Sequence, residues 1–470
     1  MTAGSTDTAA PPAARGYWRA ELTETVRLAL PIALTQLGQI AMMTSDLALI
    51  GRLGDRAVAA AALAHVVLFM LFMIGMGPVS AVAPLAAQAY GARDPRMVRR
   101  ALRVGLWAAL LLGVPLTALQ LMGETLLIAV GQAPDSAALA SQYLWGLAWS
   151  MVPAWWFIAL RNFVGSLNRP EPALWITLVA IPANALIAYA LIYGAFGLPR
   201  LEMLGAGLAT TLVNLGMCAA LAWIIIARRP FRKYHAFGRI WRIDWSLMRQ
   251  LMIIGAPISG SFLLEYGMFA AAALVMGVIG TTALAAHQIA LQIAAVMFMV
   301  PFGISMAATV RVGHAVGRGD AGETRRAGFA AIVLGASFMV MMTLLVALTR
   351  EWLPLLFLGR DSPGAADTIA LAAMLLALGA TFFIADGVQT IAAGALRGLN
   401  DTRVPMLFAA LSFWAVGFAL SYSLGLTLGL GARGVWIGFT MGLAVYALLL
   451  VWRFHLLTQR RYLPALASAE

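Results

Sequence analysis

Residues 255–277 read GAPISGSFLLEYGMFAAAALVMG, a segment in which Glu265 is the only charged side chain. A helix of about 20 residues crosses the hydrocarbon core of a bilayer, so this segment is long enough to span a membrane. The rest of the chain has a similar character, because 62% of its 470 residues are hydrophobic and 11% are charged. Soluble domains carry about 25% charged residues. The composition therefore excludes a soluble multidomain protein and predicts a polytopic membrane protein.

Hydropathy predicts an all-α fold with twelve membrane-spanning helices, because the apolar residues form long blocks and do not alternate with polar ones as in an outer-membrane barrel. The predicted spans lie at about residues 25–50, 58–88, 101–122, 137–163, 171–194, 202–227, 247–277, 283–312, 326–349, 367–396, 404–424 and 429–453. The first residues, MTAGSTDTAAPPAAR, lack the basic start and apolar centre of a signal peptide. We therefore expect residues 1–20 to be a disordered tail and the first helix to be an uncleaved span.

Basic residues are distributed unevenly between the two sides of the predicted membrane. Of the 32 Lys and Arg residues, 26 fall on the side where the first span begins and 6 on the opposite side. Because cytoplasmic loops are enriched in basic residues, both termini are predicted to be cytoplasmic. The stretch RRPFRKYHAFGRIWRIDWSLMR at 228–249 is interpreted as a cytoplasmic connector that lies on anionic lipid, and not as a nucleic-acid patch.

The two halves of the sequence resemble each other. At an offset of 226 residues they align without a gap over about seventy residues. The matched pairs include Pro31 with Pro257, Gly51 with Gly277, Gly77 with Gly303, Gly91 with Gly317 and Asp94 with Asp320. A second block, Leu167–Asn168, aligns with Leu399–Asn400 at an offset of 232. Six spans per half give both repeats the same orientation, related by a pseudo-two-fold axis along the membrane normal.

This repeat predicts two six-helix lobes around a central cavity, with alternating access by rocking of one lobe against the other. We place the N-terminal lobe at 21–227, the connector at 228–246, the C-terminal lobe at 247–455 and a cytoplasmic tail at 456–470. Pro31 and Pro257 take equivalent positions in the first span of each lobe. Each proline frees a backbone carbonyl and permits bending, so both are candidate hinges.

Apart from acids at the span ends, three carboxylates lie within predicted spans, namely Asp46, Glu265 and Asp386. A charged group at the centre of a bilayer costs about 2.5–3.5 kcal/mol even on the lenient insertion scales, so each is a functional candidate. A carboxylate pair formed by Glu265 and Asp386 would hold a proton or bind Na⁺ as a coupling site. For Asp46, an interfacial ion pair with Arg52 is an alternative. None of the three acids is duplicated by the repeat, so the two lobes are expected to play different roles.

Other polar and aromatic residues in the spans are candidates for the substrate cavity. They are Gln36, Gln39, Asn184, Tyr266, Gln288, Phe382, Phe383 and Gln389. The single cysteine, Cys218, excludes an intrachain disulfide, and the histidines have no metal-ligand spacing. We expect no cofactor and no metal other than Na⁺ at Glu265 and Asp386. No ATP-binding loop or hydrolase motif occurs at a usable place, so neither an ATP-driven pump nor an enzyme is predicted.

Four stretches carry a resemblance to a known family. They are LPIALTQLGQIAMMTSDLALIGRLG at 30–54, APLAAQAYGARD at 83–94, ALAAHQIALQIAAVMFMVPFGISMAATVRVGHAVGRGD at 283–320 and ADGVQTIAAGALRGLNDTRVP at 385–405. With these, the chain resembles the bacterial multidrug and toxic compound extrusion (MATE) transporters of the NorM-like branch over about residues 20–455. The resemblance implies a V-shaped pair of lobes in the bacterial inner membrane, working as a monomer. It also implies antiport of cationic amphipathic compounds against Na⁺ or H⁺.

By matching position, the resemblance makes Glu265 and Asp386 the cation-coupling acids of the C-terminal lobe. Asp46 becomes the acid of the N-terminal lobe, and Gln288 a cavity residue. Family members often carry a second polar residue one turn after the asparagine of span five, where this chain has Ala188. We therefore weight coupling toward the C-terminal lobe.

Two other transporter classes are alternatives. A lipid-linked oligosaccharide flippase of related architecture would carry basic residues in its cavity for pyrophosphate, and no Lys or Arg is expected at mid-span here. The stretch GRLGDRA at 51–57 faintly resembles a loop motif of the major facilitator transporters, but it follows the first span and lies on the opposite side of the membrane.

Overall fold

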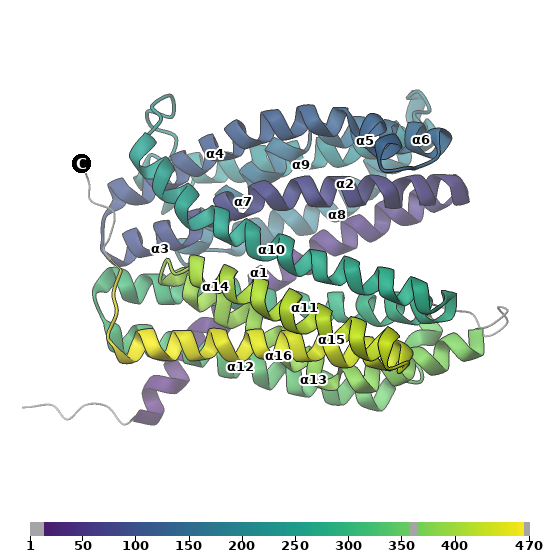
Figure 1. Cartoon of the computed structure of the whole chain (residues 1–470). Helices are drawn as coiled ribbons and strands as arrows, with labels where there is room; N and C mark the ends of the chain where they lie inside the picture. The colour runs from purple at the N-terminus through teal and green to yellow at the C-terminus, as the bar shows by residue number, and fades with distance from the viewer. Residues whose placement is uncertain (1–13, 358–364, 465–470) are drawn as a thin grey trace, which may run out of the picture.

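The computed structural model describes residues 14–357 and 365–464, so the predicted tails lie partly outside the described residues. The described residues form helices joined by short loops, without any strand (Figure 1). The α-helices are α1 (Ala14–Gly51), α2 (Asp55–Ser80), α3 (Val82–Gly91), α4 (Pro95–Leu121), α5 (Gly123–Ala129), α6 (Pro134–Ala148), α7 (Met151–Ser166), α8 (Glu171–Tyr193), α9 (Glu202–Ala227), α10 (Trp245–Ile279), α11 (Thr281–Arg318), α12 (Ala321–Thr349), α13 (Ala365–Gly398), α14 (Arg403–Ala409), α15 (Ala419–Tyr422) and α16 (Gly431–Gln459). The 3-10 helices are η1 (Ala195–Gly197), η2 (Phe231–Tyr234) and η3 (Leu353–Leu356), and the π-helices are η4 (Ala410–Phe418) and η5 (Ser423–Thr427).

The predicted all-α polytopic fold is confirmed. Among the described residues, 11 helices are long and apolar enough to cross a membrane, and α6 with α7 adds a twelfth span. The predicted span at 137–163 is a bent pair, because α6 and α7 meet at a bend of 45°. Pro153 lies in the first turn of α7. Its ring nitrogen has no N–H to donate to the carbonyl of Trp149, which explains why the helix breaks there.

The predicted span at 404–424 is helical but not a regular α-helix. After α14 it contains two π-helical segments, η4 and η5, on either side of α15. The backbone of Gly417 packs closely against that of Gly442 in α16, and Gly438 lies against Ser421. Extra residues per turn in a π-helix change which side chains face the neighbouring helix, and such segments are frequent at functional sites.

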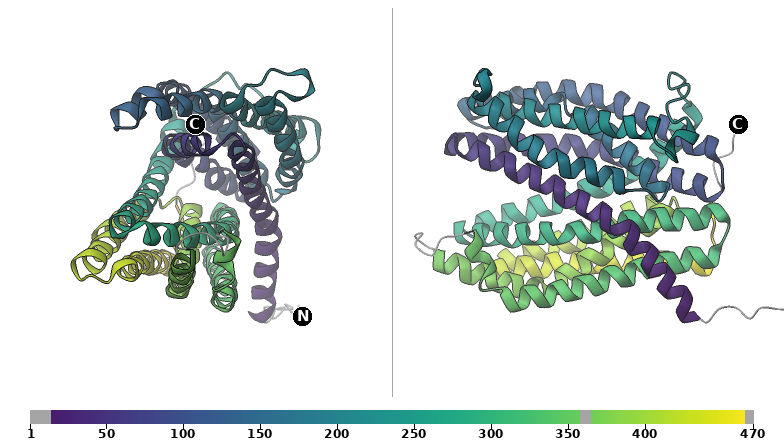
Figure 2. Two further views of the ribbon diagram at one scale, coloured as in Figure 1. Left: turned by 90° about the vertical axis from the view of Figure 1, so that its right-hand side faces the viewer. Right: turned by 180° about the vertical axis from the view of Figure 1, so that it is seen from behind.

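The helices form two groups, α1–α9 and α10–α16, which appear as the blue-purple and the green-yellow halves of Figure 1. One buried apolar cluster lies mostly within α10–α16 and two lie mostly or wholly within α1–α9. The first helix of each group also crosses to the other one. Helix α1 contacts α11 and α12 as well as α8, and α10 contacts α2 and α4 as well as α14 and α16 (Figure 2).

The contacts between the two groups follow the internal repeat. No side chain would fit at Gly77 in α2, because it packs against the backbone of Gly255 and against Ser259 in α10. Its repeat equivalent, Gly303 in α11, packs in the same way against Ala33 in α1. Ala33 and Ser259 are themselves equivalent at the offset of 226 residues. Two matched glycines therefore let α2 approach α10 and α11 approach α1 at close range.

The end of the molecule that holds the loops at 92–94, 167–170, 228–244, 319–320 and 399–402 is called the basic end below. At this end, in Figure 1 on the left, the ribbons of the two groups lie close together, and they diverge toward the opposite end. Helices α3 and α11 form the contact there.

The connector between the two groups is fastened to α4. Arg100 forms an ion pair with Asp244 at 2.6 Å, and the indole N–H of Trp107 donates to the carbonyl oxygen of Ile240 at 2.6 Å. Asp244 also caps α10, accepting the backbone N–H of Leu247 at 3.2 Å. Burial raises the pKa of the Asp244 carboxyl, but its bonds to Arg100 and Leu247 outweigh this effect and lower the pKa below its ordinary value.

Candidate coupling site and central cavity

Glu265 and Asp386 are brought together inside the C-terminal group by a shared partner. The side-chain amide of Gln389 donates to Glu265 Oε1 at 3.0 Å and to Asp386 Oδ1 at 3.1 Å. Glu265 comes from α10, whereas Asp386 and Gln389 lie one turn apart on α13. In the described part of the chain, neither carboxylate forms an ion pair within 4 Å. The structure thus places the two candidate coupling acids at one site.

Such an arrangement has few ways to neutralise two buried negative charges. Asp386 is 5% exposed, and a neutral amide is the only hydrogen-bond partner of both carboxylates among the described residues. Like charges close together in an apolar interior favour binding of a cation or a proton. Carboxylate and amide oxygens are also the ligands that hard cations prefer. No group of three or more His, Cys, Asp or Glu residues that could hold a metal ion occurs in the described ranges.

Asp46 lies in a second, separate cluster in the N-terminal group. Its Oδ1 accepts from the Asn184 amide in α8 at 2.6 Å, and its Oδ2 accepts from the Thr210 hydroxyl in α9 at 3.1 Å. The alternative of an ion pair with Arg52 is wrong, because neutral side chains hold the carboxylate. Thr210 was not assigned to a site from the sequence. It supplies the second polar partner of Asp46, which Ala188 cannot provide.

The remaining polar candidates lie outside these two clusters. Gln36 is buried and accepts a hydrogen bond from Arg161 at 2.5 Å. Gln39 is half-buried, and Gln288 is exposed on α11. Half-buried Tyr266 packs its ring against Phe69 of α2, with ring centroids 4.9 Å apart. Tyr266 therefore joins the two groups next to Glu265.

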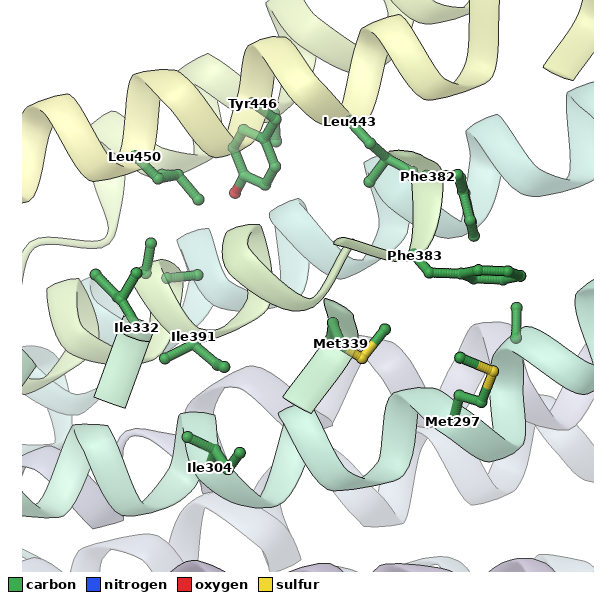
Figure 3. Close-up of a cluster of buried hydrophobic side chains, with 14 of the residues drawn as sticks. Met297, Ile304, Ile332, Met339, Phe382, Phe383, Ile391, Leu443, Tyr446 and Leu450 are labelled. Carbon is green, nitrogen blue, oxygen red and sulfur yellow. The ribbon is translucent and has the colours of Figure 1, made fainter. Parts of the chain in front are cut away.

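Phe382 and Phe383 do not line a cavity in this structure, which corrects their assignment. Their exposed fractions are 0% and 1%. Phe382 stacks on Phe439 of α16 at 5.1 Å, and both phenylalanines point into the apolar core between α11, α13 and α16 (Figure 3). The face of α13 that carries Asp386 is therefore directed into the C-terminal group. The sequence placed Asp386 within a membrane span, but it did not show toward which neighbouring helices this face of α13 points.

The two candidate hinge prolines lie inside continuous helices, Pro31 in α1 and Pro257 in α10. The carbonyl of Pro31 accepts the Thr35 hydroxyl at 2.8 Å, and that of Pro257 accepts the Ser261 hydroxyl at 3.0 Å. These two bonds are equivalent at the repeat offset. A hydroxyl that bonds the carbonyl one turn earlier is a feature of bent helices.

A small cavity of about 30 Å³ lies between the two groups, nearer to the basic end. This space holds about two water molecules. Its lining comes from both groups and includes Met76, Phe262, Met306, Arg161 and Arg397. Both guanidinium groups line this cavity from positions near the ends of their helices, Arg161 five residues before the end of α7 and Arg397 one residue before the end of α13. They therefore do not contradict the expectation that no Lys or Arg lies at mid-span.

The sequence model of a family named MatE matches residues 31–190 and 257–423. A probable multidrug resistance protein NorM of Rhodopseudomonas palustris is 64% identical over 100% of this chain and 99% of its own length. A protein of the same name from Bradyrhizobium diazoefficiens is 60% identical over 94% of each chain.

Solved structures agree with the fold. A crystal structure of a eukaryotic MATE transporter superposes with a TM-score of 0.84 at 19% identity, covering 94% of this chain and 98% of the other. An outward-facing multidrug resistance MATE family transporter gives a TM-score of 0.85 at 19% identity, with coverage of 94% and 96%.

Proposed function

The chain belongs to the MatE family of transporters, and from this premise we propose that it is a secondary active multidrug exporter. It carries cationic amphipathic compounds out across the bacterial inner membrane in exchange for Na⁺ or H⁺. Both termini lie in the cytoplasm, and a single chain is the working unit. The name of the relative from Rhodopseudomonas palustris supports multidrug resistance as the activity.

One observation carries the coupling proposal, namely the bridge that Gln389 forms between Glu265 and Asp386. Two carboxylates without a basic partner within 4 Å are expensive in a membrane interior unless a cation or proton neutralises them. The bound cation stabilises one arrangement of α10 and α13, and its release favours another. A ligand can shift such an equilibrium only by its differential affinity for the two states. Inward movement of the cation thereby drives export of the drug.

The test is export of ethidium, a cationic dye, from cells energised with lactate. We expect Glu265→Gln and Asp386→Asn each to abolish export, while membrane expression stays normal. Asp46→Asn is expected to leave part of the export intact, because Asp46 lies in the other group and is held by two neutral side chains. Gln292→Ala, at an exposed position of α11, is the control that retains full export.

The coupling ion is identified in proteoliposomes in which a Na⁺ gradient and a pH gradient are imposed one at a time. Only the gradient of the coupling ion supports dye export, and both acid variants lose the response to it. Normal export by both Glu265→Gln and Asp386→Asn would remove the coupling assignment. The flippase alternative requires that the purified protein translocates a pyrophosphate-linked lipid and does not export the dye.

A further inference from the structure

Two arginines face the central cavity, one from each group. Arg161 comes from α7 and Arg397 from α13, and the apolar lining between them includes Met76, Phe262 and Met306. The helices α7 and α13 are equivalent in the repeat, but the arginines are not. At the offset of 232, Arg161 aligns with Ala393 and Arg397 with Gly165. The two arginines are therefore separate features of the two groups, and the internal repeat does not account for them.

Neither guanidinium has a carboxylate partner. In the described part of the chain, no ion pair within 4 Å includes Arg161 or Arg397. Arg161 is 3% exposed, and it uses one N–H group to bond Gln36, while its Nε–H has no partner. Arg397 lies over the ring of Phe262, 5.3 Å from the centroid. Each arginine offers five N–H donors and keeps its charge in proteins. Most of these donors are thus free to bind an anion.

The free donors lie close to the acidic cluster. Phe262, over whose ring Arg397 lies, precedes Glu265 on α10 by three residues, so the backbone positions of Phe262 and Glu265 differ in height by about 5 Å. Glu265 and Arg397 form no ion pair within 4 Å in the described part of the chain. The centre of the molecule therefore presents a negative region in the C-terminal group and, one turn nearer the basic end, a positive region at the cavity.

We propose that Arg161 and Arg397 form a subsite for the carboxylate group of zwitterionic amphipathic substrates. The planar fork of arginine matches the two oxygens of a carboxylate, and two forks from opposite groups can close on it from both sides. The cavity of about 30 Å³ is too small for such a ligand while the two groups are in contact at the basic end. The subsite fills when the groups separate there. This inference rests on the proposed export function and names the residues that recognise the carboxylate of a substrate.

A matched pair of dyes tests the subsite in proteoliposomes. Rhodamine 123 is a cationic methyl ester, and rhodamine 110 is the corresponding free acid, which is a zwitterion at neutral pH. The quantity measured is the ratio of the transport rates of rhodamine 110 and rhodamine 123. We expect the wild type to export both dyes, and Arg161→Gln and Arg397→Gln each to lower the ratio by at least about tenfold, as expected for loss of a buried charge partner. Arg161→Lys and Arg397→Lys should restore part of the ratio.

Arg169→Gln is the matched control, because Arg169 is exposed three residues beyond the end of α7. This variant should leave the ratio unchanged. An unchanged ratio in both glutamine variants, or no export of rhodamine 110 by the wild type, overturns the subsite. If one glutamine variant does not fold, the other and the two lysine variants still decide the question. Failure of the proposed function looks different, because the wild type would then export neither dye.

Discussion

Gln88 in α3 donates its side-chain amide to the carbonyl oxygen of Gly398 in α13 at 2.8 Å, and this bond joins the two groups at the basic end. A second bond repeats it. His314 in α11, the repeat equivalent of Gln88, places its Nε2 2.7 Å from the carbonyl oxygen of Ser166 in α7. Ser166 and Gly398 are equivalent at the offset of 232. Two buried side chains related by the pseudo-two-fold axis therefore hold the basic end closed.

The equivalence predicts that glutamine can replace His314. A glutamine makes this type of bond at the position of Gln88, so His314→Gln should keep both stability and dye export close to wild type. His314→Leu leaves the Ser166 carbonyl unpaired, and we expect a loss of about 1–3 kcal/mol in the free energy of unfolding. The measurement is the thermal unfolding midpoint of the purified protein in detergent, together with ethidium export. Equal midpoints for the leucine variant and the wild type would show that this bond does not hold the groups together.

Gln389 is predicted to set the geometry of the carboxylate pair. Gln389→Ala removes both hydrogen bonds but leaves Glu265 and Asp386 in place, so the acids can still bind a cation. We therefore expect partial loss of export, about tenfold, because a misplaced binding group typically weakens function without abolishing it. Export rates are compared with those of Glu265→Gln, which should be inactive. Complete inactivity of Gln389→Ala, with normal expression, would indicate that the amide itself is a ligand of the coupling ion.

The sequence predicted the parts of this site that depend on one residue in an apolar setting. Glu265 and Asp386 were located because a lone acid in a span is expensive wherever its helix packs. The repeat was equally visible, since matched glycines such as Gly77 and Gly303 are needed at equivalent close contacts. Both features are local or are conserved between the halves of this chain, so no knowledge of packing was required.

What the sequence could not predict depends on how helices pack. Phe382 and Phe383 neighbour Asp386, but the α13 face that they share turns into the apolar core of its own group. Arg161 lies near the end of a predicted span, where arginine normally reaches the interface. The contact between the two groups buries it instead. Thr210 joins Asp46 only because α9 packs beside α8.

The Arg100–Asp244 pair, outside the spans, gives a pH-dependent prediction. The bonds of Asp244 to Arg100 and Leu247 lower its pKa in the folded protein below the ordinary value, despite partial burial. The carboxylate therefore stabilises the folded state above the unfolded pKa of about 3.9, and this contribution is lost as the pH falls through the folded pKa. Asp244→Asn should lower the unfolding midpoint at pH 7, and its difference from wild type should shrink as the pH falls below about 4.

Asp135→Asn serves as the control for this experiment, because Asp135 is an exposed acid in the first turn of α6. The unfolding midpoint of Asp135→Asn should equal that of the wild type at pH 7 and also below about pH 4. The Arg100–Asp244 bond holds the start of α10 against α4. Loss of this bond therefore also loosens the N-terminus of the helix that carries Glu265. A difference between Asp244→Asn and wild type that stays constant as the pH falls from 7 to well below about 4 would contradict the assigned ionisation. In that case capping of α10, which the asparagine preserves only in part, would account for the destabilisation.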